Sequence, residues 1–176
     1  SVNVNAATSM DEVTVESGGA LTIAATATVM DGVGFDVDVL GALTLANGGL
    51  LTGTGTVRIV HQFFWTGGAT ASGLTISIES TGSSTVNCGC TLIHGGVIQN
   101  AGTWTVINGN LHGTGEFNNL AGGVLSIQGA YDINNAWGIA LYNGGSVQVN
   151  VALHYTFFTS VFVNLSGGTV TVSGGE

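Results

Sequence analysis

Short runs in which apolar and small polar residues alternate occur along most of the chain. Examples are "ALTIAATATV" from Ala20, "LLTGTGTVRIV" from Leu50 and "TVTVS" from Thr169. Alternation with a period of two residues, rich in Val, Ile and Thr, is typical of β-strands. No long stretch shows the 3.6-residue apolar period of an amphipathic helix. The pattern therefore predicts an all-β protein with little or no helix.

Gly-Gly pairs separate most of these runs and indicate turns. Successive pairs, up to the one at Gly167, begin 19–30 residues apart. This period is longer than a β-hairpin and fits one coil of a solenoid, in which two or three short strands and their turns stack about 4.8 Å above the coil before. The pairs begin at Gly18, Gly48, Gly67, Gly95, Gly122, Gly144, Gly167 and Gly174.

The longest internal match pairs "FNNLAGGVLSIQG", which begins at Phe117, with "FVNLSGGTVTVSG", which begins 45 residues later at Phe162. The spacing corresponds to two coils. We expect the Gly pair of each copy to form a corner, and each Asn to lie at a turn, where it tolerates left-handed backbone and hydrogen-bonds to its image in a neighbouring coil. The paired residues expected to stack inward are Phe117 with Phe162 and Leu120 with Leu165, and the paired turn residues are Asn119 and Asn164.

These observations predict a single domain over residues 1–176, a parallel, right-handed β-helix (β-solenoid) of about seven or eight coils, less regular over residues 1–40. The chain contains no Pro, which fits because an interior strand of a solenoid donates hydrogen bonds to a neighbouring coil. A two-layer β-sandwich is the alternative.

The amino-acid composition limits the classes of partner that the chain can bind. The chain has one Arg (Arg58), no Lys and ten acidic residues, for a formal net charge of -9, and 44% of its residues are hydrophobic. This hydrophobicity predicts a folded chain. One cation cannot form a nucleic-acid or anionic-lipid contact, and no apolar run is long enough to span a membrane. We expect no nucleic-acid partner and no membrane insertion. We expect an extracellular location, and a protein surface that tolerates close packing between copies of the chain.

The segments "FNNLAGG", "FFWTGG", "LTGTGTV" and "NAGTWTV" resemble the Gly-, Asn- and Thr-rich repeats of large prokaryotic cell-surface proteins. The repeats are those of the filamentous-haemagglutinin and autotransporter-passenger type. The resemblance covers most of residues 40–176. It implies a right-handed β-helix and an extracellular or cell-surface location.

The carboxylates of "DGVGFDVD" form the main candidate cluster for chemistry, with Asp31, Asp36 and Asp38. Asp36 and Asp38 lie two residues apart and would share a face of a strand. Carboxylate clusters on β-helices bind calcium or act as acid and base. Calcium is thus the only cofactor candidate, and an acidic loop between coils is the alternative interpretation.

Histidines give no further site. His61, His94, His112 and His154 show no metal-ligand spacing, and no G-x-S-x-G segment is present. Isolated histidines on strands are expected to be structural. We therefore expect no enzymatic activity.

The two cysteines, Cys88 and Cys90 in "NCGCTL", leave three interpretations open. They are small buried hydrophobes, a local disulfide in a cramped ring, or thiols that bridge neighbouring subunits. Asn164 begins the only N-x-[ST] sequon, and it is a candidate for glycosylation.

Aromatic residues cluster in "HQFFW" and "HYTFF". Consecutive aromatic residues on a strand point to opposite faces, so one of each adjacent pair is expected outside the core. An exposed aromatic row is a sugar-stacking platform or a subunit contact, and cover by a loop of the same chain is the alternative. The candidates are Phe63, Phe64, Trp65, Phe157 and Phe158.

The leading functional hypothesis is an extracellular structural subunit that self-assembles into a filament, sheath or surface layer. A solenoid exposes strand edges at its ends, and the strand-like termini show no cap, so we expect a head-to-tail homopolymer. A β-helical adhesin that binds glycans is the alternative. A polysaccharide-degrading enzyme centred on the aspartates is a third hypothesis.

Overall fold

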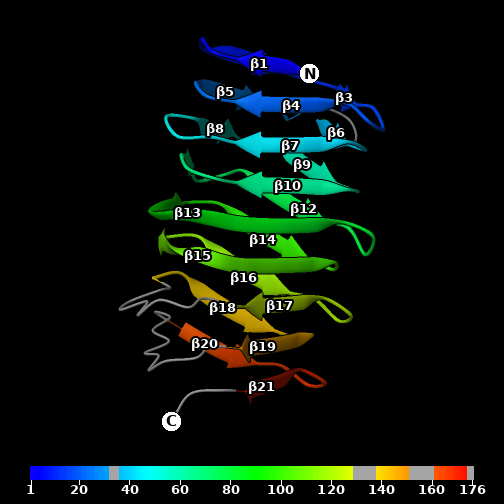
Figure 1. The fold of residues 1–176 in the computed structure, drawn as a ribbon, viewed down its shortest axis with the longest axis vertical. Helices are drawn as coiled ribbons and strands as arrows, with labels where there is room; N and C mark the ends of the chain where they lie inside the picture. The colour runs from blue at the N-terminus through cyan, green and yellow to red at the C-terminus, as the bar shows by residue number, and fades with distance from the viewer. Residues whose placement is uncertain (32–35, 129–137, 151–160, 174–176) are drawn as a thin grey trace.

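The computed structural model describes residues 1–31, 36–128, 138–150 and 161–173. These residues form a parallel β-solenoid of about seven turns that runs along the long axis of the molecule (Figure 1). Every strand pairing in the described part is parallel, which confirms the predicted fold and excludes the β-sandwich. The described residues contain no helix, and thus none that could span a membrane.

The strands stack on three faces, which we call faces I, II and III. Face I contains β1 (Val2–Val4), β4 (Ala20–Ile23), β7 (Ala42–Leu45), β10 (Gln62–Trp65), β17 (Val124–Ile127), β19 (Ser146–Asn150) and β21 (Thr169–Ser173). Face II contains β2 (Thr8–Met10), β5 (Thr26–Val29), β8 (Leu50–Gly53) and β11 (Ala69–Thr70). Two long strands, β13 (Ser83–His94) and β15 (Thr103–Gly113), continue from face I into face II.

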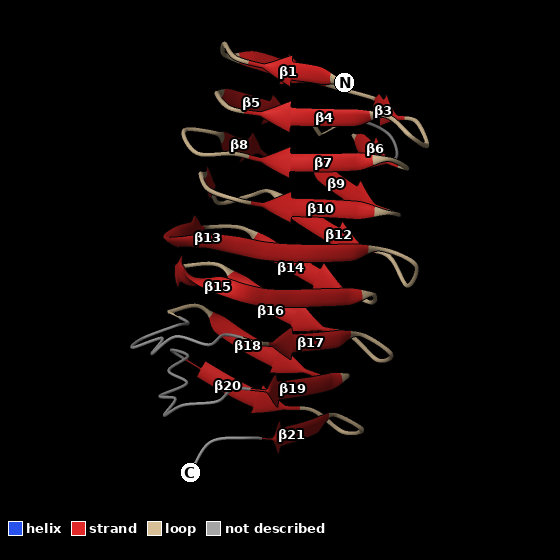
Figure 2. Cartoon of the chain, viewed as in Figure 1, coloured by secondary structure: helices blue, strands red, loops and turns tan. Residues whose placement is uncertain are grey.

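Face III is formed by one strand from each coil. Its members are β3 (Val13–Val15), β6 (Val37–Val39), β9 (Thr56–Ile59), β12 (Thr75–Ile78), β14 (Val97–Asn100), β16 (Glu116–Asn119), β18 (Ala140–Asn143) and β20 (Val161–Asn164). The register aligns Asn119, Asn143 and Asn164, so the two coils between the matched phrases are 24 and 21 residues long. The predicted two-coil spacing is confirmed. Strands appear at every level of the stack (Figure 2), and the first coils, from β1 on, keep the same parallel register.

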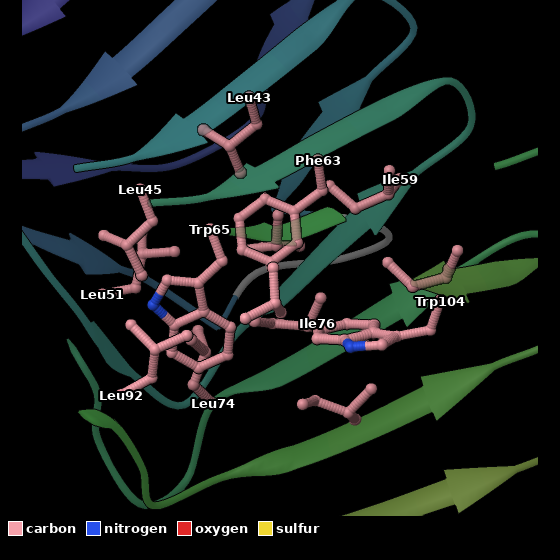
Figure 3. Packing of buried hydrophobic residues seen from close by; sticks show 14 of the residues in the cluster. Leu43, Leu45, Leu51, Ile59, Phe63, Trp65, Leu74, Ile76, Leu92 and Trp104 are labelled. Carbon is pink, nitrogen blue, oxygen red and sulfur yellow. The ribbon is translucent and has the colours of Figure 1, made fainter. Parts of the chain in front are cut away.

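Alternate residues of each strand point inward and form the core. In β7, for example, Leu43 and Leu45 are buried, while Ala42 and Thr44 are half-buried. Near the middle of the solenoid the inward rows become aromatic, and the rings of Phe63, Trp65 and Trp104 lie together in the interior (Figure 3). The register places the small Ser84 between Phe63 and Trp104, which leaves room for their rings, 6.1 Å apart between centroids.

Candidate assembly interface

A ladder of asparagine side chains runs along one edge of face III, where the strands β14, β16, β18 and β20 end. Asn100 Nδ2 donates to Asn119 Oδ1 at 2.8 Å, Asn119 to Asn143 at 2.8 Å, and Asn143 to Asn164 at 2.7 Å. Three of the four residues, all but Asn164, are buried. The predicted hydrogen bonds between Asn images are confirmed. Buried amides with good partners fix the register of the coils, because a slipped coil would leave them without hydrogen bonds.

The ladder has a direction, because in each of its three side-chain hydrogen bonds the asparagine of the earlier coil donates to the asparagine of the next coil. Asn119 and Asn143 each donate also to a backbone carbonyl of the next coil, those of Ser146 and Thr169. At the other end of the row Asn100 is aligned with the apolar Ile78, and its Oδ1 is buried without a hydrogen-bond partner. Asn164 donates to Gly168 O within its own turn, and the described residues supply no next coil for it.

The turn after the ladder explains why the repeated phrase contains two glycines. Gly122 occupies the third position of a β-turn closed by the Gly123 N–H and Leu120 O, and its φ of 86° favours glycine. Gly123 is required for space, since an added Cβ would lie 2.2 Å from Asn100 O. The predicted Gly corner is confirmed. No asparagine has positive φ among the described residues, so the predicted left-handed turn asparagine is wrong.

The leucines of the phrase do not point inward as predicted. Leu120 is 41% exposed and Leu165 is 48% exposed. Asn119 takes the last inward position of its strand, and the following residue already belongs to the turn. The expectation for Phe117, which is fully buried, is confirmed.

The C-terminal end of the described solenoid is apolar and exposed. Phe162 is aligned with Leu141 and, two coils back, with Phe117, yet it is 42% exposed. On face I, Val170 continues a buried inward row and is 48% exposed. These side chains occupy core positions on the last coil of the described stack. The described residues of this last coil carry no charge.

The first coil of the described solenoid also exposes apolar side chains, but it carries charge. Val2 is exposed, and an apolar hollow of about 220 Å³ lies beside it, lined in part by Val13, Val15 and Leu21. Acidic residues surround this end, because the corners of the first coil carry three exposed carboxylates, namely Asp11, Glu12 and Glu16. The described residues at the two ends therefore differ in charge, and both ends present apolar inward rows.

The single cation lies between two acids on face III. Arg58 Nη1 is 3.0 Å from Asp38 Oδ1 in the preceding coil, and Arg58 Nε is 3.4 Å from Glu79 Oε1 at the end of β12. All three side chains are partly exposed, so the pairs contribute little stability. They do compensate charge along this side of the solenoid.

The aspartate cluster is dispersed in the structure. Asp31 is exposed, Asp38 pairs with Arg58, and Asp36 is buried and accepts a hydrogen bond from the Thr56 N–H. Within the described residues, no three His, Cys, Asp or Glu side chains form a group that could hold a metal ion. The described residues contain no preformed group of ligands for calcium, and calcium binding at these aspartates stays a prediction.

Three of the aromatic candidates lie in the described residues, and of these only Phe64 faces outward. Phe63 and Trp65 are inward residues of β10 and are essentially inaccessible, so the prediction that they form a stacking or contact surface is wrong. The predicted opposite orientation of Phe63 and Phe64 is confirmed. Phe157 and Phe158 lie outside the described residues.

His94 is a buried structural residue that the sequence did not distinguish from the other histidines. Its Nδ1 is 2.6 Å from Thr70 Oγ1, and its Nε2 is 3.3 Å from Glu116 O. Because the Glu116 carbonyl oxygen can only accept a hydrogen bond, Nε2 of His94 carries the proton. Nδ1 is then the acceptor, and the Thr70 hydroxyl donates to it. Burial lowers the pKa of His94 to about 4, which keeps the ring neutral at neutral pH.

The remaining candidate residues are the two cysteines and Asn164. Cys88 and Cys90 form a disulfide within β13, which is one of the three interpretations left open by the sequence. The Asn164 amide contributes to the ladder and to its own turn, and its glycosylation stays a prediction.

Comparison of the chain with protein-family models, with curated proteins and with solved structures gave no match.

Proposed function

We propose that the chain is a structural protein, the subunit of an extracellular filament, sheath or surface layer that assembles by stacking solenoids head to tail. One observation carries the proposal. The inward positions of the last described coil are apolar and exposed, whereas the same positions of the matched phrase two coils earlier are buried. A coil from a second copy would cover them as a further coil of the same chain would.

The inward rows support this arrangement when they are continued from one copy into the next. The Phe162 row begins at Val13, and the Val170 row begins at Val2, because the strand registers connect these positions through the stack. A first coil placed on a last coil thus brings valine against phenylalanine and valine against valine. Burial of such side chains is the main favourable term in association.

The same arrangement places Asn164 against Val15, an asparagine against an apolar residue. The chain already contains such a step, where Asn100 is aligned with Ile78. In that internal step the apolar residue precedes the asparagine, whereas at the junction Asn164 precedes Val15. Asn164 Nδ2 donates to Gly168 O within its own turn, and this hydrogen bond does not depend on the junction.

Charge supports a head-to-tail polarity. Two N-terminal ends placed together would bring six exposed carboxylates into one contact, since each carries Asp11, Glu12 and Glu16. The described residues of the last coil, 161–173, carry no charge and do not repel this acidic end. Like charges across an interface cost several kcal/mol, so head-to-head pairing is disfavoured. Head-to-tail stacking of the coils along the solenoid axis does not close into a ring and produces fibres.

Sedimentation velocity at increasing protein concentration tests the proposal. The native chain is expected to form species whose size grows with concentration. The Phe162→Asp variant is expected to remain monomeric, because its assembly would bury an unpaired carboxylate in the junction. Leu120→Asp is the matched control, since Leu120 is equally exposed in the earlier copy but lies away from the ends. A native chain that stays monomeric at high concentration would contradict the proposal.

A second candidate, a surface module that binds glycans, is supported by Phe64. This ring faces outward on face I between the aligned Thr44 and Thr85, which gives an uncharged aromatic platform. Glycan-array binding that is lost in Phe64→Ala, together with a monomeric state, would favour it. Glycan binding that is unchanged in Phe64→Ala would contradict a role for Phe64 in binding.

A further inference from the structure

The Cys88–Cys90 disulfide closes a loop with one intervening residue, at a bulge in β13. Asn87 is aligned with Asn108 and Thr91 with Asn110, so the three residues Cys88-Gly89-Cys90 lie opposite the single residue Gly109. An added Cβ on Gly109 would lie 3.1 Å from Cys88 Sγ. The bulge and this glycine together make room for the two sulfur atoms.

So small a loop contributes little to stability. In the chain-entropy account, the stabilisation by a disulfide grows with the number of residues in the closed loop, and it is smallest for a loop of this size. The coil is also held on both sides of the bulge. Residues 83–86 pair with β10 and β15, and residues 93–94 pair with β11 and β15. We therefore expect the fold to persist without this covalent bond.

The disulfide is accessible and chemically asymmetric. Asn87 and Gly89 are exposed, and both cysteines are only partly buried. The Cys90 N–H donates a hydrogen bond to Cys88 Sγ, 3.1 Å away. A backbone donor aimed at sulfur stabilises a thiolate there, so Cys88 is the better leaving group and Cys90 is the sulfur that an incoming thiolate attacks.

We propose that Cys88 and Cys90 form a thiol–disulfide exchange site for low-molecular-weight thiols. A thiolate attacks Cys90 Sγ, the bond between the two protein sulfurs breaks, and the electron pair leaves on Cys88 as thiolate. A second thiolate attacks the sulfur of the first reagent in the mixed disulfide, releases the oxidised reagent and leaves Cys90 as thiolate. Two electrons enter the pair, and the reverse steps return them.

This site is independent of end-to-end assembly, because β13 lies midway along the solenoid (Figure 1). Its position on a lateral corner keeps it accessible in a single solenoid and in a stacked array. The site would therefore respond to the surrounding thiol pool whether or not the chain assembles.

The test equilibrates the native protein with mixtures of reduced and oxidised glutathione, followed by alkylation and mass spectrometry, with circular dichroism recorded in parallel. We expect a reversible gain of two alkylated sulfurs with an unchanged β-sheet spectrum. In samples quenched early, the glutathione adduct is expected on Cys90 severalfold more often than on Cys88.

Two controls keep the outcome decisive. The double variant Cys88→Ser/Cys90→Ser is expected to keep the native spectrum, which shows that the fold does not need the bond. Gly109→Ala is expected to slow re-oxidation, because its methyl group would crowd Cys88 Sγ. Alkylation that appears only in denaturant, or reduction that abolishes the β-sheet signal, would overturn the proposal. An early adduct mainly on Cys88 would overturn the assigned leaving group.

Discussion

The two copies of the repeated phrase have nearly the same local structure and very different surroundings. Both turns have a glycine with φ of 86° and a closing N–H to O hydrogen bond, of 2.9 Å in the first copy and 3.0 Å in the second. Phe117 in the first copy is fully buried, whereas Phe162 in the second is 42% exposed. The local sequence determines the turn and the register, and the neighbouring coil determines the burial.

This difference is expected for a quasi-one-dimensional fold. The stability of a solenoid is approximately the sum of the intrinsic stability of each coil and the contacts between adjacent coils. The coil with Phe117 has neighbours on both sides, and the coil with Phe162 has a described neighbour on one side only. Substitutions at matched positions of the two copies therefore isolate the contribution of the second neighbour.

Phe117→Ala gives the largest expected contrast. It should lower the free energy of unfolding by about 3–5 kcal/mol, because it leaves a cavity next to Trp104, whose ring centroid lies 5.2 Å from that of Phe117. Phe162→Ala in the unassembled protein should cost less than half as much, because much of its surface is exposed. Urea unfolding of both variants measures the difference. Equal losses would show that the two coils are equally covered.

The buried histidine provides the next test, through pH. The unfolded chain takes up a proton at His94 near pH 6.5, whereas the folded chain takes it up only near pH 4. Stability should therefore fall by about 3 kcal/mol as the pH decreases from 6.5 to 4, with no further loss from this group at lower pH.

Urea unfolding of His94→Gln across this pH range should show a flatter dependence than the native chain. His61→Gln, at an exposed position, is the control and should leave the dependence unchanged. Hydrogen exchange should locate the acid-induced loosening in the interior coils around β11 and β13 rather than in β20. A native chain whose stability is constant over this range would contradict the buried neutral ring.

Asn119→Ala should cost about 2 kcal/mol, since it removes two ladder hydrogen bonds and leaves the buried amide groups of Asn100 and Asn143 without these partners. Asn164→Ala should cost about 1 kcal/mol or less in the unassembled protein, because it removes one ladder bond at the open end. Thermal unfolding of the two variants compares them. A larger loss for Asn164 would reverse the order that burial predicts.

The smallest expected contrast lies at the turn glycines. Gly122→Ala and Gly167→Ala should each cost about 1 kcal/mol, because an alanine at positive φ is strained and no atom lies within 4 Å of either added Cβ. The two losses should agree, since a local backbone cost does not depend on the neighbouring coil. Differential scanning calorimetry of both variants measures this, and a clear difference between them would show that the turns are not equivalent.

Periodic features of the sequence were sufficient to predict the architecture. Alternation in runs such as "ALTIAATATV" indicated strands, and the spacing of the Gly-Gly pairs and of the matched phrases indicated coils. The position of a residue within its coil was harder to predict. Leu120 follows the inward Asn119 directly and lies in the turn, a difference of one residue that hydrophobicity alone does not reveal.

Side-chain positions that depend on contacts between coils were not predictable. Trp65 appeared as a surface aromatic because its neighbours Phe63 and Phe64 are aromatic too, and only the strand register shows that it shares the inward side with Phe63. The burial of His94 depends on Thr70 and Glu116, which lie more than 20 residues away in sequence. The bulge that accommodates the disulfide depends on Gly109 in the next coil.

Electron microscopy of negatively stained protein tests the central claim most directly, namely that a second copy covers the open coil as a further coil would. We expect unbranched filaments with an axial repeat of about 34–38 Å, the length of seven to eight coils at about 4.8 Å each. Phe162→Asp should abolish them, and Leu120→Asp should not. Uniform single particles at high concentration, or filaments that persist in Phe162→Asp, would contradict it.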